Sequence, residues 1–167
     1  DIIINSGVVL TLGSDFTFLA DSNADGTGAF LMNSGASIAG GGFDLMIASS
    51  GAPTLGNLSD LGILNLQAVS GTPVFTANPA ATTWSSITDF RLTNGARLNR
   101  FTGSGAAGDP YMIHDVYGLQ AMQGFLSSNF GLANDINAAD TVNWNGGAGF
   151  DPVGYTTRYS YEAPTDP

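Results

Sequence analysis

The sequence predicts an all-β protein, a parallel β-helix followed by a small unit of strand, short helix and strand. Three observations predict this fold class. Apolar and polar residues alternate along many short stretches, which is the period of a half-buried strand. Similar strands recur with a period of roughly 20–27 residues, as in the coils of a solenoid. Turn clusters rich in glycine and serine separate the strands.

The coils of the first part, residues 1–102, are predicted from four apolar stretches of similar pattern. In a β-helix each coil repeats the strand of the coil below at a spacing of about 4.8 Å. We therefore expect the first residues of these stretches to stack as one apolar column. These residues are Phe16, Phe43, Ile63 and Phe90.

A second echo links residues 4–7 (INSG) with residues 32–35 (MNSG). Short strands at close intervals, separated by turns, would also fit an antiparallel β-sandwich, which is the alternative fold. The recurrence of similar strands one period apart favours the β-helix, because each of its coils repeats the coil below.

The pattern changes after a joint of glycine, alanine and serine at residues 102–109. Asp115 is a candidate N-cap for a short helix. The buried side of that helix would consist of Tyr117, Gly118, Leu119, Met122 and Leu126. Strand alternation returns over residues 129–136. The predicted organisation is β-helix coils at 1–102, a repeat unit at 103–154 and an extended tail at 155–167.

The composition argues against several functions. The chain has 14 acidic residues, four arginines and no lysine, and its net charge is −10. Four arginines cannot neutralise a track of phosphates, so nucleic-acid binding is not expected. An anionic membrane surface is disfavoured by the same sign of charge. No apolar run approaches the roughly 18–20 residues that span a bilayer, so membrane insertion is not expected either.

The second part resembles a known family. Residues 108–113 (GDPYMI), 118–122 (GLQAM), 126–138 (LSSNFGLANDINA) and 144–154 (WNGGAGFDPVG) follow in the order of the repeat beside the GLUG motif of very large secreted bacterial proteins. These proteins include filamentous-haemagglutinin-like adhesins, and residues 1–102 are similar in composition to their coil repeats. The resemblance implies a right-handed parallel β-helix, an extracellular or cell-surface place, and adhesion or scaffold duty.

One loop has the ligand spacing of a calcium site. Asp21, Asn23 and Asp25 occupy positions 1, 3 and 5 of the first half of an EF-hand-type loop, and Gly26 permits the sharp turn. Position 12 is Met32, so the bidentate glutamate is missing. Calcium is the one cofactor that the sequence suggests, and a plain turn without an ion is the alternative.

Four aromatic residues are candidates for ligand contact: Trp84, Trp144, Tyr155 and Tyr159. Exposed aromatic rings in polar surroundings suit sugar stacking or protein contact, whereas burial as loop anchors explains them equally well. The single histidine, His114, has no partner nucleophile or orienting carboxylate marked out by spacing, and catalysis is not expected.

These features favour a non-enzymatic, extracellular structural or adhesive module of a bacterial surface or secreted protein. A carbohydrate-binding module and a polysaccharide-active enzyme on a β-helix are the alternatives. The expected partners are further copies of the chain or neighbouring modules of a longer chain, and a cell-surface glycan or protein receptor.

Self-association is expected because the chain opens with apolar strand residues and no preceding polar cap. The far end is unlike the first and carries an aromatic tail, so head-to-tail contacts would grow open filaments. The residues expected in these contacts are Ile2, Ile3, Ile4, Val8, Leu10 and Tyr161.

Overall fold

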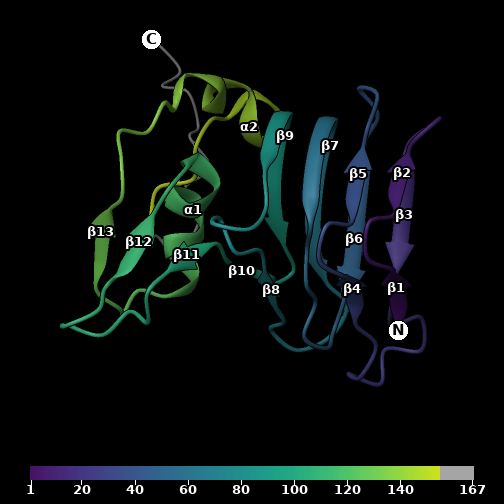
Figure 1. Ribbon diagram of the computed structural model, residues 1–167, viewed down its shortest axis with the longest axis horizontal. Helices are drawn as coiled ribbons and strands as arrows, with labels where there is room; N and C mark the ends of the chain where they lie inside the picture. The colour runs from purple at the N-terminus through teal and green to yellow at the C-terminus, as the bar shows by residue number, and fades with distance from the viewer. Residues whose placement is uncertain (155–167) are drawn as a thin grey trace, which may run out of the picture.

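The computed structural model describes residues 1–154 and is mostly β, with short helices only in its C-terminal part (Figure 1). Ten strands form a stack along the long axis of the molecule, which we call the parallel stack (residues 2–99). Their bounds are β1 (Ile2–Ile4), β2 (Val9–Thr11), β3 (Phe16–Leu19), β4 (Phe30–Met32), β5 (Ser37–Ala39), β6 (Leu45–Ser49), β7 (Asn57–Ala68), β8 (Val74–Thr76), β9 (Trp84–Thr93) and β10 (Arg97–Asn99).

Strands of the parallel stack pair with one another in parallel. β7 and β9 are long and pair with each other along both of their halves. Their first halves continue the sheet from the pair β2–β5, and their second halves continue it from the pair β3–β6. The sheet therefore curls around the core. Separate pairs join β1 to β4 and β8 to β10, and single bridges through Thr54 link β4 to β8. Ile4 lies opposite Met32, as the sequence echo predicts. The antiparallel sandwich is therefore wrong for residues 2–99.

The register corrects the predicted apolar column. Phe43 follows a turn in which Gly41 and Gly42 have φ of 60° and 84°, so it stays exposed and precedes its strand. Ile63 faces outward, because β7 turns at Asp60 (φ 54°) and a slip of one residue reverses the face of a strand. The residues that lie in register are Phe16, Leu45, Leu64 and Phe90.

The core of the parallel stack is largely aliphatic. Inward side chains from successive strands stack in columns and have almost no exposure to solvent. They include Ile38, Leu45, Ile47, Leu58, Leu64, Leu66, Phe75 and Leu98. Burial of each such side chain contributes roughly 1.5–3 kcal/mol. The residues that alternate with them form the outer faces of the sheets.

The C-terminal unit (residues 100–154) begins with a three-stranded sheet and a short helix. The carboxylate of Asp115 accepts the Gly118 N–H at 2.9 Å at the start of α1 (Val116–Ala121), which confirms the predicted N-cap. Leu126 lies beyond the helix and is exposed, so its predicted burial is wrong. The other elements are β11 (Phe101–Thr102), β12 (Tyr111–Ile113), η1 (Met122–Gly124), β13 (Phe130–Leu132), η2 (Ala139–Asn143) and α2 (Trp144–Gly147).

An aromatic cluster and a buried arginine, Arg100, join this unit to the far end of the parallel stack, where the guanidinium donates to the Thr82 hydroxyl at 2.9 Å. Phe90 makes edge-to-face contacts with Tyr117 and Trp144, with ring centroids 5.5 and 5.4 Å apart. Arg100 donates to Asp115 at 2.7 Å, and its burial lowers the pKa of its guanidinium, an effect that Asp115 opposes. Because α2 lies against β9 and α1 against β10, the far end of the stack is covered. In residues 1–154, no helix is long and apolar enough to cross a membrane.

Candidate functional site

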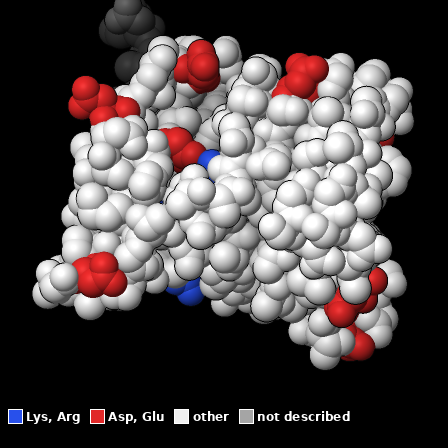
Figure 2. All heavy atoms as spheres, in the orientation of Figure 1, with Lys and Arg blue, Asp and Glu red and all other residues white. Residues whose placement is uncertain are grey.

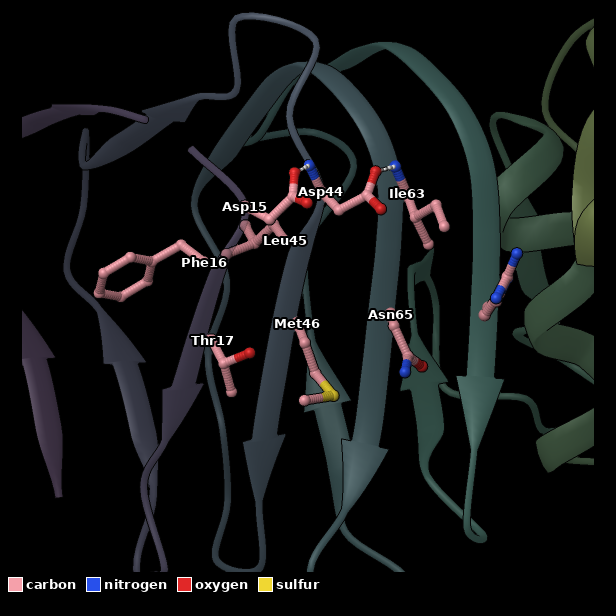
Figure 3. A pocket seen from close by; sticks show the side chains of 9 residues that line it. Asp15, Phe16, Thr17, Asp44, Leu45, Met46, Ile63 and Asn65 are labelled. Atoms are coloured by element: carbon pink, nitrogen blue, oxygen red, sulfur yellow. Dashed lines mark hydrogen bonds between the residues drawn. The ribbon is translucent and has the colours of Figure 1, made fainter. Parts of the chain in front are cut away.

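A groove of about 260 Å³ lies on the outer face of the sheet, where β3, β6, β7 and β9 run side by side (Figure 3). Its lining combines two carboxylates, an amide, a hydroxyl and a guanidinium with apolar side chains. The lining residues are Asp15, Phe16, Thr17, Asp44, Leu45, Met46, Ile63, Asn65 and Arg91.

The floor of the groove follows from the strand register. One outward residue of each strand lies opposite the next, and these residues are Thr17, Met46, Asn65 and Arg91. They directly follow the buried column that contains Leu64, and successive residues of a strand point to opposite faces. Four strands spaced about 4.8 Å apart give a row roughly 14 Å long. The floor therefore fits an elongated ligand.

Two aspartates form one rim of the groove (Figure 3). One oxygen of Asp15 accepts the N–H of Asp44 at 3.0 Å, and one oxygen of Asp44 accepts the N–H of Ile63 at 2.8 Å. These bonds fix each carboxylate against the next strand. Within residues 1–154 the second oxygen of each carboxylate has no protein donor, so both can accept hydrogen bonds from a ligand.

An ion pair sits at the β9 end of the row. Arg91 donates from Nε to Asp89 at 2.9 Å and forms an ion pair with it. Asp89 is buried and also accepts the backbone N–H of Asn145 at 2.6 Å and of Gly146 at 3.1 Å. Because Asp89 neutralises Arg91, the two rim carboxylates leave the groove negative, and the groove repels anionic ligands.

Donors and apolar surface complete the groove. The side-chain oxygen of Asn65 accepts the hydroxyl of Thr93 at 2.9 Å, and its amide N–H groups are left to donate to a ligand. Thr17 adds a hydroxyl, and the side chain of Met46 adds a soft apolar surface. The arrangement suits a neutral ligand that has many hydroxyl groups and some exposed C–H surface.

None of these groove residues was predicted as a ligand-binding residue from the sequence, although a signal for the rim exists. An aspartate directly precedes the residue of the buried column in three places, at residues 15–16, 44–45 and 89–90. Because Phe16, Leu45 and Phe90 lie in one register column, the aspartate before each of them lies beside that column. The register itself is what the sequence did not reveal.

The predicted calcium loop is closed by its own hydrogen bonds. The two oxygens of Asp21 accept the N–H groups of Asp25 and Gly26 at 3.2 and 3.0 Å. Asp25 accepts the amide of Asn23 at 2.8 Å and the hydroxyl of Thr27 at 2.6 Å, and this hydroxyl lowers the pKa of the Asp25 carboxyl. The geometry is that of an Asx-rich turn. Among the described residues, no group of three or more acidic or histidine side chains could hold a metal ion.

The predicted ligand-binding tryptophans are core residues, which corrects that prediction. Trp84 is 7% exposed and donates its indole N–H to the carbonyl of Gly56 at 3.1 Å, and Trp144 is 1% exposed. Neither ring offers a free face to a sugar, and burial as loop anchors, the other interpretation, accounts for both. Tyr155 and Tyr159 lie outside the described residues.

The residues predicted for self-association differ in their exposure to solvent. Ile3 and Val8 are exposed and Ile2 and Leu10 are partly exposed, whereas Ile4 is buried in the core, so its predicted role as a contact residue is wrong. Tyr161 lies outside the described residues.

Uncharged atoms cover most of the face shown in Figure 2, and acidic side chains gather mainly near its margins. His114 directly follows β12 of the three-stranded sheet in the C-terminal unit, and its Nε2 is 2.9 Å from the hydroxyl of Thr102. The histidine is therefore not part of the groove lining.

Comparison with known proteins shows a local likeness. The chain is similar to Halomucin of Haloquadratum walsbyi, with 38% identity over 69 residues. The matched stretch is 40% of this chain and 1% of halomucin, so the chain spans only a very small part of that relative. No family model matches the sequence, and no solved structure matches it.

Proposed function

We propose that this chain is a non-enzymatic module of an extracellular or cell-surface protein, in which a structural parallel stack carries an adhesive groove. The groove is the observation that carries this proposal, because two carboxylate oxygens and the amide N–H groups of Asn65, none of them bonded to protein within residues 1–154, lie on one outer surface. The likeness to halomucin supports an extracellular or surface place. Further copies of the chain, neighbouring modules and a surface glycan or protein are the partners that such a module would meet.

We further infer that the parallel stack is a right-handed β-helix. Its support is the regular return of the chain onto itself, which brings Phe30 of β4 opposite Ile2 of β1. Connections between parallel strands of one sheet are right-handed in about 98% of cases. An experimental structure that traces the connections from β2 to β5 and from β5 to β7 would test the hand. Left-handed connections would contradict this inference.

The ligand proposed for the groove is a neutral glycan. Its hydroxyl groups would donate to Asp15 and Asp44 and accept from Asn65, and its C–H surface would lie on Met46. Anionic glycans would be repelled by the rim. Several hydrogen bonds to charged groups on a preformed floor would hold such a chain without any chemical step.

A glycan panel probed with the purified chain tests the proposal. We expect neutral glycans to bind, and Asp44→Asn and Asn65→Ala each to weaken that binding at least about tenfold, which corresponds to ~1.4 kcal/mol. Asp60→Asn is the matched control, since this exposed aspartate of β7 does not line the groove. Absence of binding, or equal loss in the control, would contradict the proposal. Reducing-sugar release that Asp44→Asn abolishes would instead make the protein an enzyme.

A further inference from the structure

The first half of β7 carries the motif Asn57-Leu58-Ser59 on the outer face of the sheet. Asn57 and Ser59 are partly exposed, whereas Leu58 between them has no exposure to solvent. Since successive residues of a strand point to opposite faces, both polar side chains point outward. Asparagine followed two residues later by serine or threonine is the acceptor motif for N-linked glycans in exported proteins. The motif occurs once in the 167 residues.

The side-chain amide of Asn57 is fixed through its oxygen, and its nitrogen is left free. Oδ1 accepts the backbone N–H of Thr83 at 2.8 Å, which holds the amide against the next strand. Nδ2, the atom to which an N-linked glycan is attached, donates to no residue within 1–154 and is not buried. A glycan on Nδ2 would therefore replace no hydrogen bond of the described fold.

The surface around the motif has room for a sugar. β7 lies between β5 and β9 there, and the outward residues of these two strands are small (Figure 1). Ser37 lies opposite Asn57, and Ala39 and Ser85 lie opposite Ser59. Because these side chains are short, the neighbouring strands do not reach over the amide of Asn57.

We propose that Asn57 is an N-glycosylation site, which takes an activated glycosyl phosphate as its donor. Nδ2 attacks C1 of the first sugar, so that a C1–N bond forms and the C1–O bond to the phosphate breaks. The phosphate leaves with the electron pair, and Nδ2 loses one proton. This inference rests on the extracellular place proposed above but not on the groove, whose residues Ile63 and Asn65 follow the turn of β7 at Asp60.

Mass spectrometry of the full chain, exported by cells that N-glycosylate their exported proteins, tests the proposal. A protease that cuts before aspartate releases residues 44–59, in which Asn57 is the only asparagine. We expect this peptide to carry a glycan, and a peptide N-glycosidase to remove it with conversion of Asn57 to aspartate. Because Oδ1 can keep its bond to Thr83 in the glycosylated chain, the circular dichroism spectrum should be the same before and after removal.

Asn65 is the matched control in the same strand. It is also partly exposed on an outer face, and its oxygen also accepts a hydrogen bond, but Gln67 stands where the motif needs a hydroxyl. We expect Asn65 to stay unmodified, Ser59→Ala to abolish the glycan at Asn57, and Ser59→Thr to keep it. An unmodified Asn57 in the exported wild type would overturn the proposal. So would a glycan at Asn57 that persists in Ser59→Ala.

Discussion

The parallel stack and the C-terminal unit are stabilised in different ways. In the stack, the same inward position recurs from strand to strand, as in the column that contains Leu45 and Leu64, so regular burial of aliphatic side chains supplies the stability. The C-terminal unit has no such repetition. Large aromatic rings fill its interior, and side chains such as Asp89, Asp115 and Gln120 satisfy its irregular backbone.

A stack of repeated strands needs a different structure at its end. Each strand of the stack leaves backbone groups for a following strand, and the last strands need a different partner. Here the C-terminal unit packs against the last strands, and two carboxylates help to hold it in place. Asp89 reaches from β9 to the N–H groups of Asn145 and Gly146, and Asp115 binds Arg100 and also caps α1.

The largest effect should come from the aromatic centre of the C-terminal unit. Trp144→Ala would remove a side chain that is almost fully buried against Phe90 and Tyr117, at a cost of about 3–5 kcal/mol in the free energy of unfolding. Urea denaturation measures this loss. Leu126→Ala replaces an exposed residue of the same unit and should change stability by less than about 0.5 kcal/mol. Equal losses in both variants would contradict the aromatic core described here.

The buried ion pair should rank second. Asp115→Ala would leave the guanidinium of Arg100 buried without its counter-ion and would remove the cap of α1, for a loss of about 2–3 kcal/mol. Asp115→Asn keeps a cap acceptor for Gly118 and lacks only the charge. If hydrogen exchange at α1 is equally fast in both variants, the N-cap does not stabilise α1 beyond what the ion pair contributes.

A smaller effect is expected at the turn near the start of the stack. Asp21→Ala would remove the acceptor for the N–H groups of Asp25 and Gly26 and cost about 1–3 kcal/mol. We expect a calcium chelator to leave the melting temperature of the wild type unchanged, because donors of the loop already occupy these oxygens. A fall in melting temperature with the chelator, absent in Asp25→Ala, would establish a calcium site instead.

The smallest effect is a dependence on alkaline pH. Burial raises the pKa of Tyr117 from 10.0 to about 12, so the folded state favours the neutral phenol. This contribution to stability is complete below pH 10 and is lost as the pH rises towards 12, because the unfolded chain releases the proton first. Tyr117→Phe should remove this part of the pH dependence in denaturation curves. A variant with the same alkaline loss as the wild type would exclude Tyr117 as its source.

Local features were predicted better than the groove. Asp115 could be identified as an N-cap because capping depends on three residues of neighbouring chain. The column positions predicted at Phe43 and Ile63 were misplaced by two residues and by one, because turn glycines and the bend at Asp60 shift the register. The groove needs that register across four strands, from β3 to β9, so a local pattern could not reveal it.

The burial and contacts of the arginine side chains affect how the folded chain resists proteases that cut after basic residues. The sequence has no lysine, so arginines are the only side chains at which such an enzyme can act. Arg100 is buried, Arg91 is held by Asp89, and the guanidinium of Arg97 lies over the ring of Phe125 at 4.3 Å. Since a protease must draw an extended segment of backbone into its own site, cutting at these residues, which lie in strands or directly between two strands, requires local unfolding first. For residues 1–154, the lifetime against such enzymes is therefore governed by how often the sheets open.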